Sequence, residues 1–175
     1  MRLHRNDLKI FDSAVAHHAA SRLLRAKFSA FGPVDSDLQN SEFKQAALEP
    51  WKENLHLSVE VLIGFAAELY LKGFIQIYGA PQKRIYGLYE LFTALPQKVQ
   101  DKLQECSDDL ELGEPIERHL KKVADSFAGV RYIHEGFPGN DVLSPKILEV
   151  FHKHLLESVG GRSAERFTLE GTVEE

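Results

Sequence analysis

Apolar residues recur at helical spacing along most of this chain, and this periodicity constrains the fold more than any other feature. No segment alternates apolar and polar residues as a half-buried strand would, and no hairpin dipeptide separates two β-branched runs. We therefore expect an all-α protein, an up-and-down helical bundle of four long helices and one or two short ones. Proline and glycine place the expected helices at residues 7–31, 50–79, 88–95, 96–106, 116–130 and 145–159. The polar connector 34–49 has room for a short helix at 42–48.

The first expected helix carries two apolar stripes. One stripe consists of Leu8, Phe11, Val15, Ala19 and Leu23, and the other of Ile10, Ala14, Leu24 and Phe28. A helix that is apolar on two faces lies at the centre of its bundle or packs against a partner chain. On this basis we expect a homodimer. The sequence leaves open which stripe forms the contact between the two copies.

Length and composition place the chain among ordinary globular proteins. Its 175 residues, 43% hydrophobic and 27% charged, fit one domain with a buried core. We expect that domain to span residues 1–161, with a frayed or flexible tail at 162–175. The single cysteine, Cys106, excludes an intramolecular disulfide and fits a reducing compartment. The first residues lack the pattern of a secretory signal, so we expect a cytoplasmic protein.

The most apolar stretch, residues 59–77, is interrupted by Glu68 and Lys72. A buried core helix therefore explains it better than a membrane span, and no membrane contact is expected. The two charged residues stand i, i+4 in the favourable order. A carboxylate buried there needs a partner, which Lys72, Arg131 or the hydroxyl of Tyr132 can provide. We favour an internal polar network that sets helix register, and the alternative is a carboxylate at the floor of a binding groove.

The charge of the chain is negative overall but unevenly distributed. A formal net charge of −5 argues against broad, salt-dependent binding to nucleic acid. Residues 1–31 nevertheless hold six Lys or Arg against two Asp. His18, Arg22 and Arg25 stand at i, i+4 and i+7 and therefore share one helical stripe. We interpret this stripe as a solvated basic face, with an anion-binding site as the alternative.

Three segments follow one another in a distinctive order. An apolar helix with a Glu-Leu-x-x-Lys patch precedes a turn into a short Leu-Phe helix, and a later helix ends in an Arg-Tyr pair. The segments are AAELYLKGFIQIYG (66–79), RIYGLYELFTALP (84–96) and FAGVRYIHEG (127–136). In this order, over about half of the chain, they resemble the HEPN superfamily of helical-bundle domains. One departure is Tyr86-Gly87, where the family often has His-Asp.

The resemblance implies a homodimeric binding or regulatory module. Its ligand would be RNA, a nucleotide or a partner protein, and such modules often work beside a nucleotidyltransferase or within defence and stress systems. This is an analogy at the level of the fold.

The catalytic motif of the family is missing. Ribonuclease members use Arg-x(4–6)-His, and no arginine of this chain is followed by a histidine at that spacing. The nearest arrangements are Arg131 with His134 and the adjacent Arg118-His119. We therefore expect a non-catalytic module. One alternative is a divergent, metal-independent ribonuclease in which His134 acts as acid or base and Arg131 holds phosphate, with Glu68 in support. The other is a helical scaffold for protein partners without a nucleic-acid role.

The remaining polar residues give little indication of chemistry. His17 and His18, and likewise His152 and His154, point in different directions on a regular helix, so no metal site is expected. The glycines are isolated and form no phosphate-binding loop, so no cofactor is expected. Cys106 lies among acidic residues without basic neighbours, which argues against a catalytic thiolate.

Overall fold

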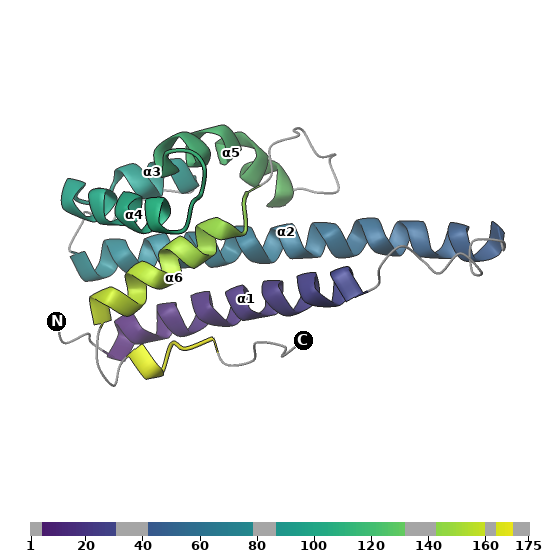
Figure 1. Ribbon diagram of the computed structural model, residues 1–175, viewed down its shortest axis with the longest axis horizontal. Coiled ribbons are helices and arrows are strands. Elements are labelled where there is room, and N and C mark those ends of the chain that lie inside the picture. Colours follow the sequence, from purple (N-terminus) through teal and green to yellow (C-terminus); the bar gives the residue numbers. More distant parts are fainter. Residues whose placement is uncertain (1–4, 31–41, 79–86, 132–142, 160–163, 170–175) are drawn as a thin grey trace.

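Six helices make up most of the part of the chain that the structure describes. The computed structural model describes residues 5–30, 42–78, 87–131, 143–159 and 164–169, and the side chains of 8–26, 58–78, 87–123, 143–159 and 164–169. The helices are α1 (Arg5–Ala30), α2 (Glu42–Tyr78), α3 (Leu88–Thr93), α4 (Gln97–Asp109), α5 (Ile116–Arg131) and α6 (Lys146–Val159) (Figure 1). No strand occurs among the residues that the structure describes. The prediction of an all-α protein is confirmed.

α1 and α2 form an antiparallel hairpin (Figure 1). The buried stripe of α1 consists of Phe11, Ala14, His18 and Ser21. These residues are spaced by three and four positions, which keeps one seam against the neighbouring helices. The predicted apolar stripe that includes Leu23 does not stay in the core as far as this residue, because Leu23 is 51% exposed. His18 and Ser21 take inward positions since their polar atoms are bonded; the Ser21 hydroxyl donates to the His18 carbonyl at 2.7 Å.

Aromatic rings fill the seam between α1 and α2. The ring centroid of Phe11 lies 5.4 Å from that of Phe74 and 6.5 Å from that of Tyr70. Gly73 makes this close approach of the two helices possible, because a Cβ at that position would lie 2.6 Å from ring carbons of Phe11. Phe151 of α6 completes the group at 6.3 Å from Phe74. This aromatic part of the core therefore lies where α1, α2 and α6 meet.

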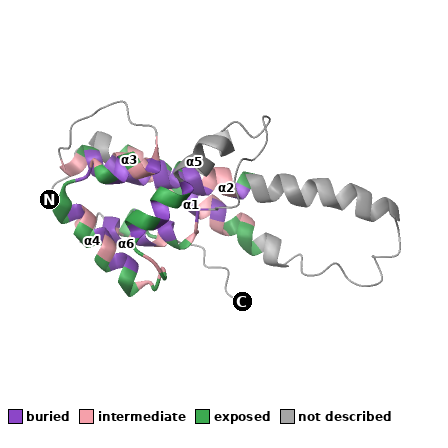
Figure 2. Cartoon of the chain, turned by 90° about the horizontal axis from the view of Figure 1, so that it is seen from above, coloured by how far each residue is buried: buried purple, intermediate pink, exposed green. Residues whose placement is uncertain are grey.

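α3, α5 and α6 cover the C-terminal half of α2, and α4 packs against α5 and α6. α3 and α5 both contact α2 and each other, while α6 contacts both α2 and α4 (Figure 1). Each contributes an apolar face to the same core, which includes Leu88, Leu91, Leu103, Ile116, Leu120, Ile147, Leu148 and Leu155. Figure 2 shows the buried residues gathered where these helices pack together.

α2 is longer than the sequence predicted. We expected a helix beginning near Pro50, preceded by a separate short helix around residues 42–48, and the structure has one helix of 37 residues from Glu42 to Tyr78. A proline inside a helix removes one backbone hydrogen bond and kinks or breaks many helices, but it does not end this one. Within the described part of the chain, no helix combines the length and the apolar character that crossing a membrane requires.

The C-terminal segment differs from the expected frayed tail in its described part. Phe167 is fully buried, and its ring packs edge-on against Phe11 of α1 at 6.2 Å between centroids. The carbonyl of Phe167 accepts a hydrogen bond from Nε2 of His152 at 2.7 Å. Arg166 binds the carboxylate of Asp12 with two nitrogens, one of them at 2.8 Å. Residues 164–169 therefore hold α1 and α6 together.

Candidate functional site

A polar cluster joins three helices inside the bundle. His18 of α1 lies between Tyr70 of α2 and Glu149 of α6. Its Nδ1 is 3.3 Å from the Tyr70 hydroxyl, and its Nε2 is 3.2 Å from Oε1 of Glu149. Nε of Arg22, one turn further along α1, lies 3.8 Å from the same carboxylate oxygen. His18 is 1% exposed and Tyr70 is fully buried, so the carboxylate and the guanidinium form the outer edge of the cluster.

Burial and neighbouring charges shift the pKa values of Glu149, Tyr70 and His152. The hydrogen bond from His18 lowers the pKa of Glu149, against the opposing effect of burial, and Arg22 adds to the lowering. Burial raises the pKa of the Tyr70 hydroxyl, and the nearby Glu149 raises it further. Burial lowers the pKa of His152, whose ring lies 5.7 Å from that of His18. The Tyr70 hydroxyl is therefore buried and protonated, and the two contacts of His18 connect α1 to α2 and α6.

The predicted basic stripe is only partly on the surface. His18 points into the bundle, and the interpretation of the stripe as a solvated basic face is wrong for this residue. Arg25 is exposed and Arg22 is 41% exposed. A carboxylate accompanies each arginine, Glu149 beside Arg22 and Glu60 within the electrostatic range of Arg25. The positive charge of the stripe is therefore largely offset within the chain.

Glu60 is a carboxyl group with an unusual environment on α2. Burial raises its pKa from 4.5 to about 7, and the positive charge of Arg25 opposes this shift. Its folded pKa thus lies above its unfolded one. Burial of Glu60 is tolerated while its carboxyl group is neutral and destabilises the fold once the group is ionised. This contribution to the free energy of unfolding is therefore fully present below pH 4.5 and is lost as the pH rises through about 7.

Replacing Glu60 with glutamine is expected to stabilise the protein at alkaline pH. The amide resembles the neutral acid, so Glu60→Gln should raise the free energy of unfolding at pH 8 by on the order of 1 kcal/mol, a value reduced for solvent screening at a half-buried site. At pH 4.5 the variant and the wild type should agree. Urea unfolding at both pH values measures this, with Glu105→Gln on the exposed face of α4 as the control. An equal difference in the free energy of unfolding at both pH values would contradict a raised pKa for Glu60.

The predicted pair on α2 is confirmed. Nζ of Lys72 donates to Oε1 of Glu68 at 2.6 Å, with the Glu68 side chain 7% exposed and that of Lys72 41% exposed. A buried carboxylate with a cation at the surface fits the interpretation as an internal polar network. α5 ends at Arg131, whose side chain lies outside the described residues, as do Tyr132 and His134. Their roles in binding or catalysis stay predictions.

His119 of α5 also has a structural role. The backbone N–H of Ser144 donates to Nε2 of His119 at 3.1 Å, so this nitrogen is the acceptor. Nδ1 therefore carries the hydrogen and donates to Oε1 of Glu114 at 3.0 Å. Lys122 binds the same carboxylate at 2.6 Å. His119 thus ties the start of α5 to the residues that precede α6.

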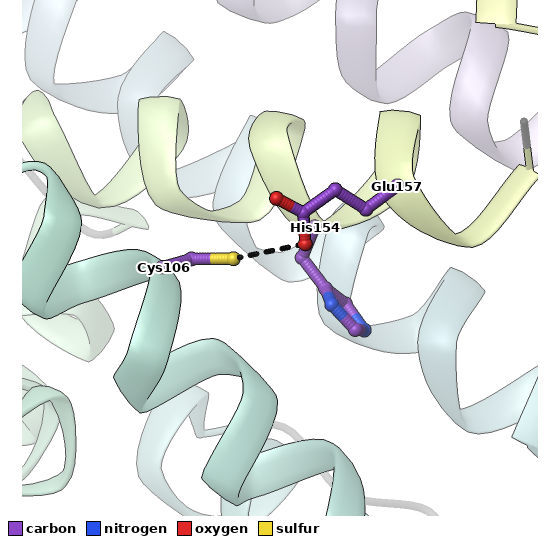
Figure 3. A group of neighbouring side chains, drawn as sticks. All are labelled: Cys106, His154 and Glu157. Carbon is purple, nitrogen blue, oxygen red and sulfur yellow. Dashed lines mark hydrogen bonds between the residues drawn. The ribbon is translucent and has the colours of Figure 1, made fainter.

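The structure also brings together a group that the sequence analysis missed. Cys106 of α4 donates its thiol hydrogen to Glu157 of α6 at 3.6 Å, and His154 lies one turn before that glutamate (Figure 3). Burial, together with the negative charge of Glu157, raises the pKa of Cys106 to about 11. The thiol is therefore protonated at neutral pH. The sequence signal was His-x-x-Glu, which places His154 and Glu157 on one helical face.

Comparison of the chain with protein-family models, curated proteins and solved structures found no match. The resemblance to the HEPN superfamily therefore stays a prediction from the sequence. Any functional assignment depends on the residues described above.

Proposed function

We propose that this chain is a non-catalytic, HEPN-like helical module that works as a homodimer and binds RNA, a nucleotide or a partner protein. The observation that carries the proposal is the exposure of two large apolar side chains on the α1–α2 hairpin. Leu23 of α1 is 51% exposed and Phe65 of α2 is 41% exposed. Exposed apolar area of this kind is characteristic of contact surfaces between proteins when it belongs to a larger patch.

Both residues belong to stripes with the spacing of helix–helix contacts. Ala16, Ala20 and Leu23 of α1 stand at i, i+4 and i+7, and Leu62, Phe65 and Leu69 of α2 at i, i+3 and i+7. All six side chains are exposed or half-buried. Alternating steps of three and four residues match the packing of one helix against another. We define these six residues as the hairpin stripes, and a second copy of the hairpin would bury them.

Three of the described histidines have structural contacts, which supports a binding role over catalysis at these residues. His18, His119 and His152 are buried and bonded to groups of the protein itself. The net charge of −5 favours a defined ligand over broad contact with nucleic acid. A place in a defence or stress system follows from the resemblance and is part of the same proposal.

Charge on the hairpin stripes should separate the two copies. Leu23→Glu and Phe65→Glu would each place a carboxylate in a desolvated contact, and we expect each to weaken self-association about 30-fold or more. Sedimentation velocity over a dilution series measures this, with circular dichroism to confirm an unchanged helix content. Lys98→Glu on the exposed surface of α4 is the control and should leave association unchanged. Equal association constants for all four proteins would contradict the proposed contact.

A further inference from the structure

The group formed by Cys106, His154 and Glu157 has the composition of a metal site. Each residue offers one ligand atom, and these atoms all lie within 4.8 Å of one another. The geometry points to a site for one divalent transition-metal ion, with zinc as the ion that the three side chains fit best. This inference does not depend on the proposed dimer.

The distances require little movement. In a tetrahedral zinc site with bonds of about 2.3 Å to sulfur and about 2.0 Å to oxygen, the two donor atoms lie about 3.5 Å apart. Sγ of Cys106 and Oε2 of Glu157 are 3.6 Å apart. α4 and α6 pack against each other along this region, which fixes the separation of the two side chains. One ring nitrogen has to approach by about an ångström to complete the set.

The orientation of His154 provides an independent argument. The residue is 4% exposed, and its Nδ1 has no hydrogen-bond partner among the described residues. Its Nε2 lies 3.3 Å from the hydroxyl of Tyr78 and 3.4 Å from that of Ser158. A histidine that binds a metal usually holds the ring with its other nitrogen in this way. A buried imidazole nitrogen without a partner costs stability, and a metal ion would remove that cost.

Charge and chemistry narrow the choice of ion. A thiolate and a carboxylate together neutralise a divalent cation, so the occupied site would carry no net charge into a partly buried position. The ion would take the place of the thiol proton, which passes to solvent. Thiolate and imidazole favour zinc over magnesium or calcium, which prefer oxygen ligands. Three protein ligands leave the fourth tetrahedral position for a water molecule. Solvent can reach this position on the side of Glu157, which is exposed.

Titration of the full chain, reduced and metal-free, with Co²⁺ and then Zn²⁺ tests the inference. We expect one Co²⁺ per chain with a sulfur-to-cobalt charge-transfer absorption, which Zn²⁺ then displaces. Cys106→Ser should abolish that absorption, and Glu157→Gln, a change at an exposed position that leaves the core intact, should weaken zinc binding at least about tenfold. Glu105→Gln, next to Cys106 on the exposed face of α4, and His17→Ala should bind as the wild type does. Cobalt binding without the sulfur absorption, binding unaffected by Cys106→Ser, or no binding would each overturn the site.

Discussion

Phe167→Ala is expected to lower the free energy of unfolding by about 3–5 kcal/mol, the usual cost of removing a fully buried phenylalanine. Phe167 has no exposed surface, and its ring packs against Phe11 in the seam of the bundle. Its loss leaves a cavity between α1 and α6 that the short segment 164–169 has little means to close. Chemical unfolding followed by circular dichroism measures the effect.

The neighbouring Thr168→Ala serves as the matched control, because Thr168 is exposed and its truncation should change stability by less than about 0.5 kcal/mol. A loss below about 1 kcal/mol for Phe167→Ala would show that the segment does not contribute to the core in solution. The frayed tail expected from the sequence would then be the better description.

His18→Leu is expected to destabilise the protein by about 2–3 kcal/mol, although leucine fills a similar space. The substitution leaves the buried hydroxyl of Tyr70 without its partner and removes the hydrogen bond to Glu149. Adding Tyr70→Phe removes the stranded hydroxyl, so the double variant should be more stable than His18→Leu alone. Unfolding of the four proteins in a double-mutant cycle gives the coupling energy.

His17 offers the control for this cycle. It stands next to His18 on α1 but is half-buried and contacts the carbonyl of Ser13 through Nδ1 at 2.8 Å. His17→Leu should therefore cost much less than His18→Leu. If Tyr70→Phe adds its full cost to that of His18→Leu, the two residues are uncoupled and the buried network is wrong.

The helices could be predicted because local signals mark them. Pro96 precedes α4, Pro115 precedes α5, and Gly160-Gly161 follows α6, so an apolar stripe and its end signals coincide in each case. The pair on α2 was predictable from its i, i+4 spacing, which places both side chains on one face of the helix. Pro50 shows the limit of such signals, because α2 continues through it.

Contacts between residues distant in sequence could not be predicted. Phe167 is buried by Phe11, which lies at the other end of the chain, and no local pattern in the last residues indicates this. Leu23 was expected in an apolar stripe and is exposed, whereas His18 was expected at the surface and is buried. His18 can be buried because Tyr70 and Glu149 provide partners for its ring nitrogens. The group of Cys106, His154 and Glu157 depends on the packing of α4 against α6. Sequence spacing indicates only that His154 and Glu157 share a face of one helix.

The central claim is the homodimer, and the molecular mass of the wild-type chain in solution tests it most directly. Sedimentation velocity across the micromolar range should show a species of twice the chain mass of 19.8 kDa, which dissociates on dilution. A species of 19.8 kDa at every concentration would contradict the account, because Leu23 and Phe65 would then not lie in a contact between two copies.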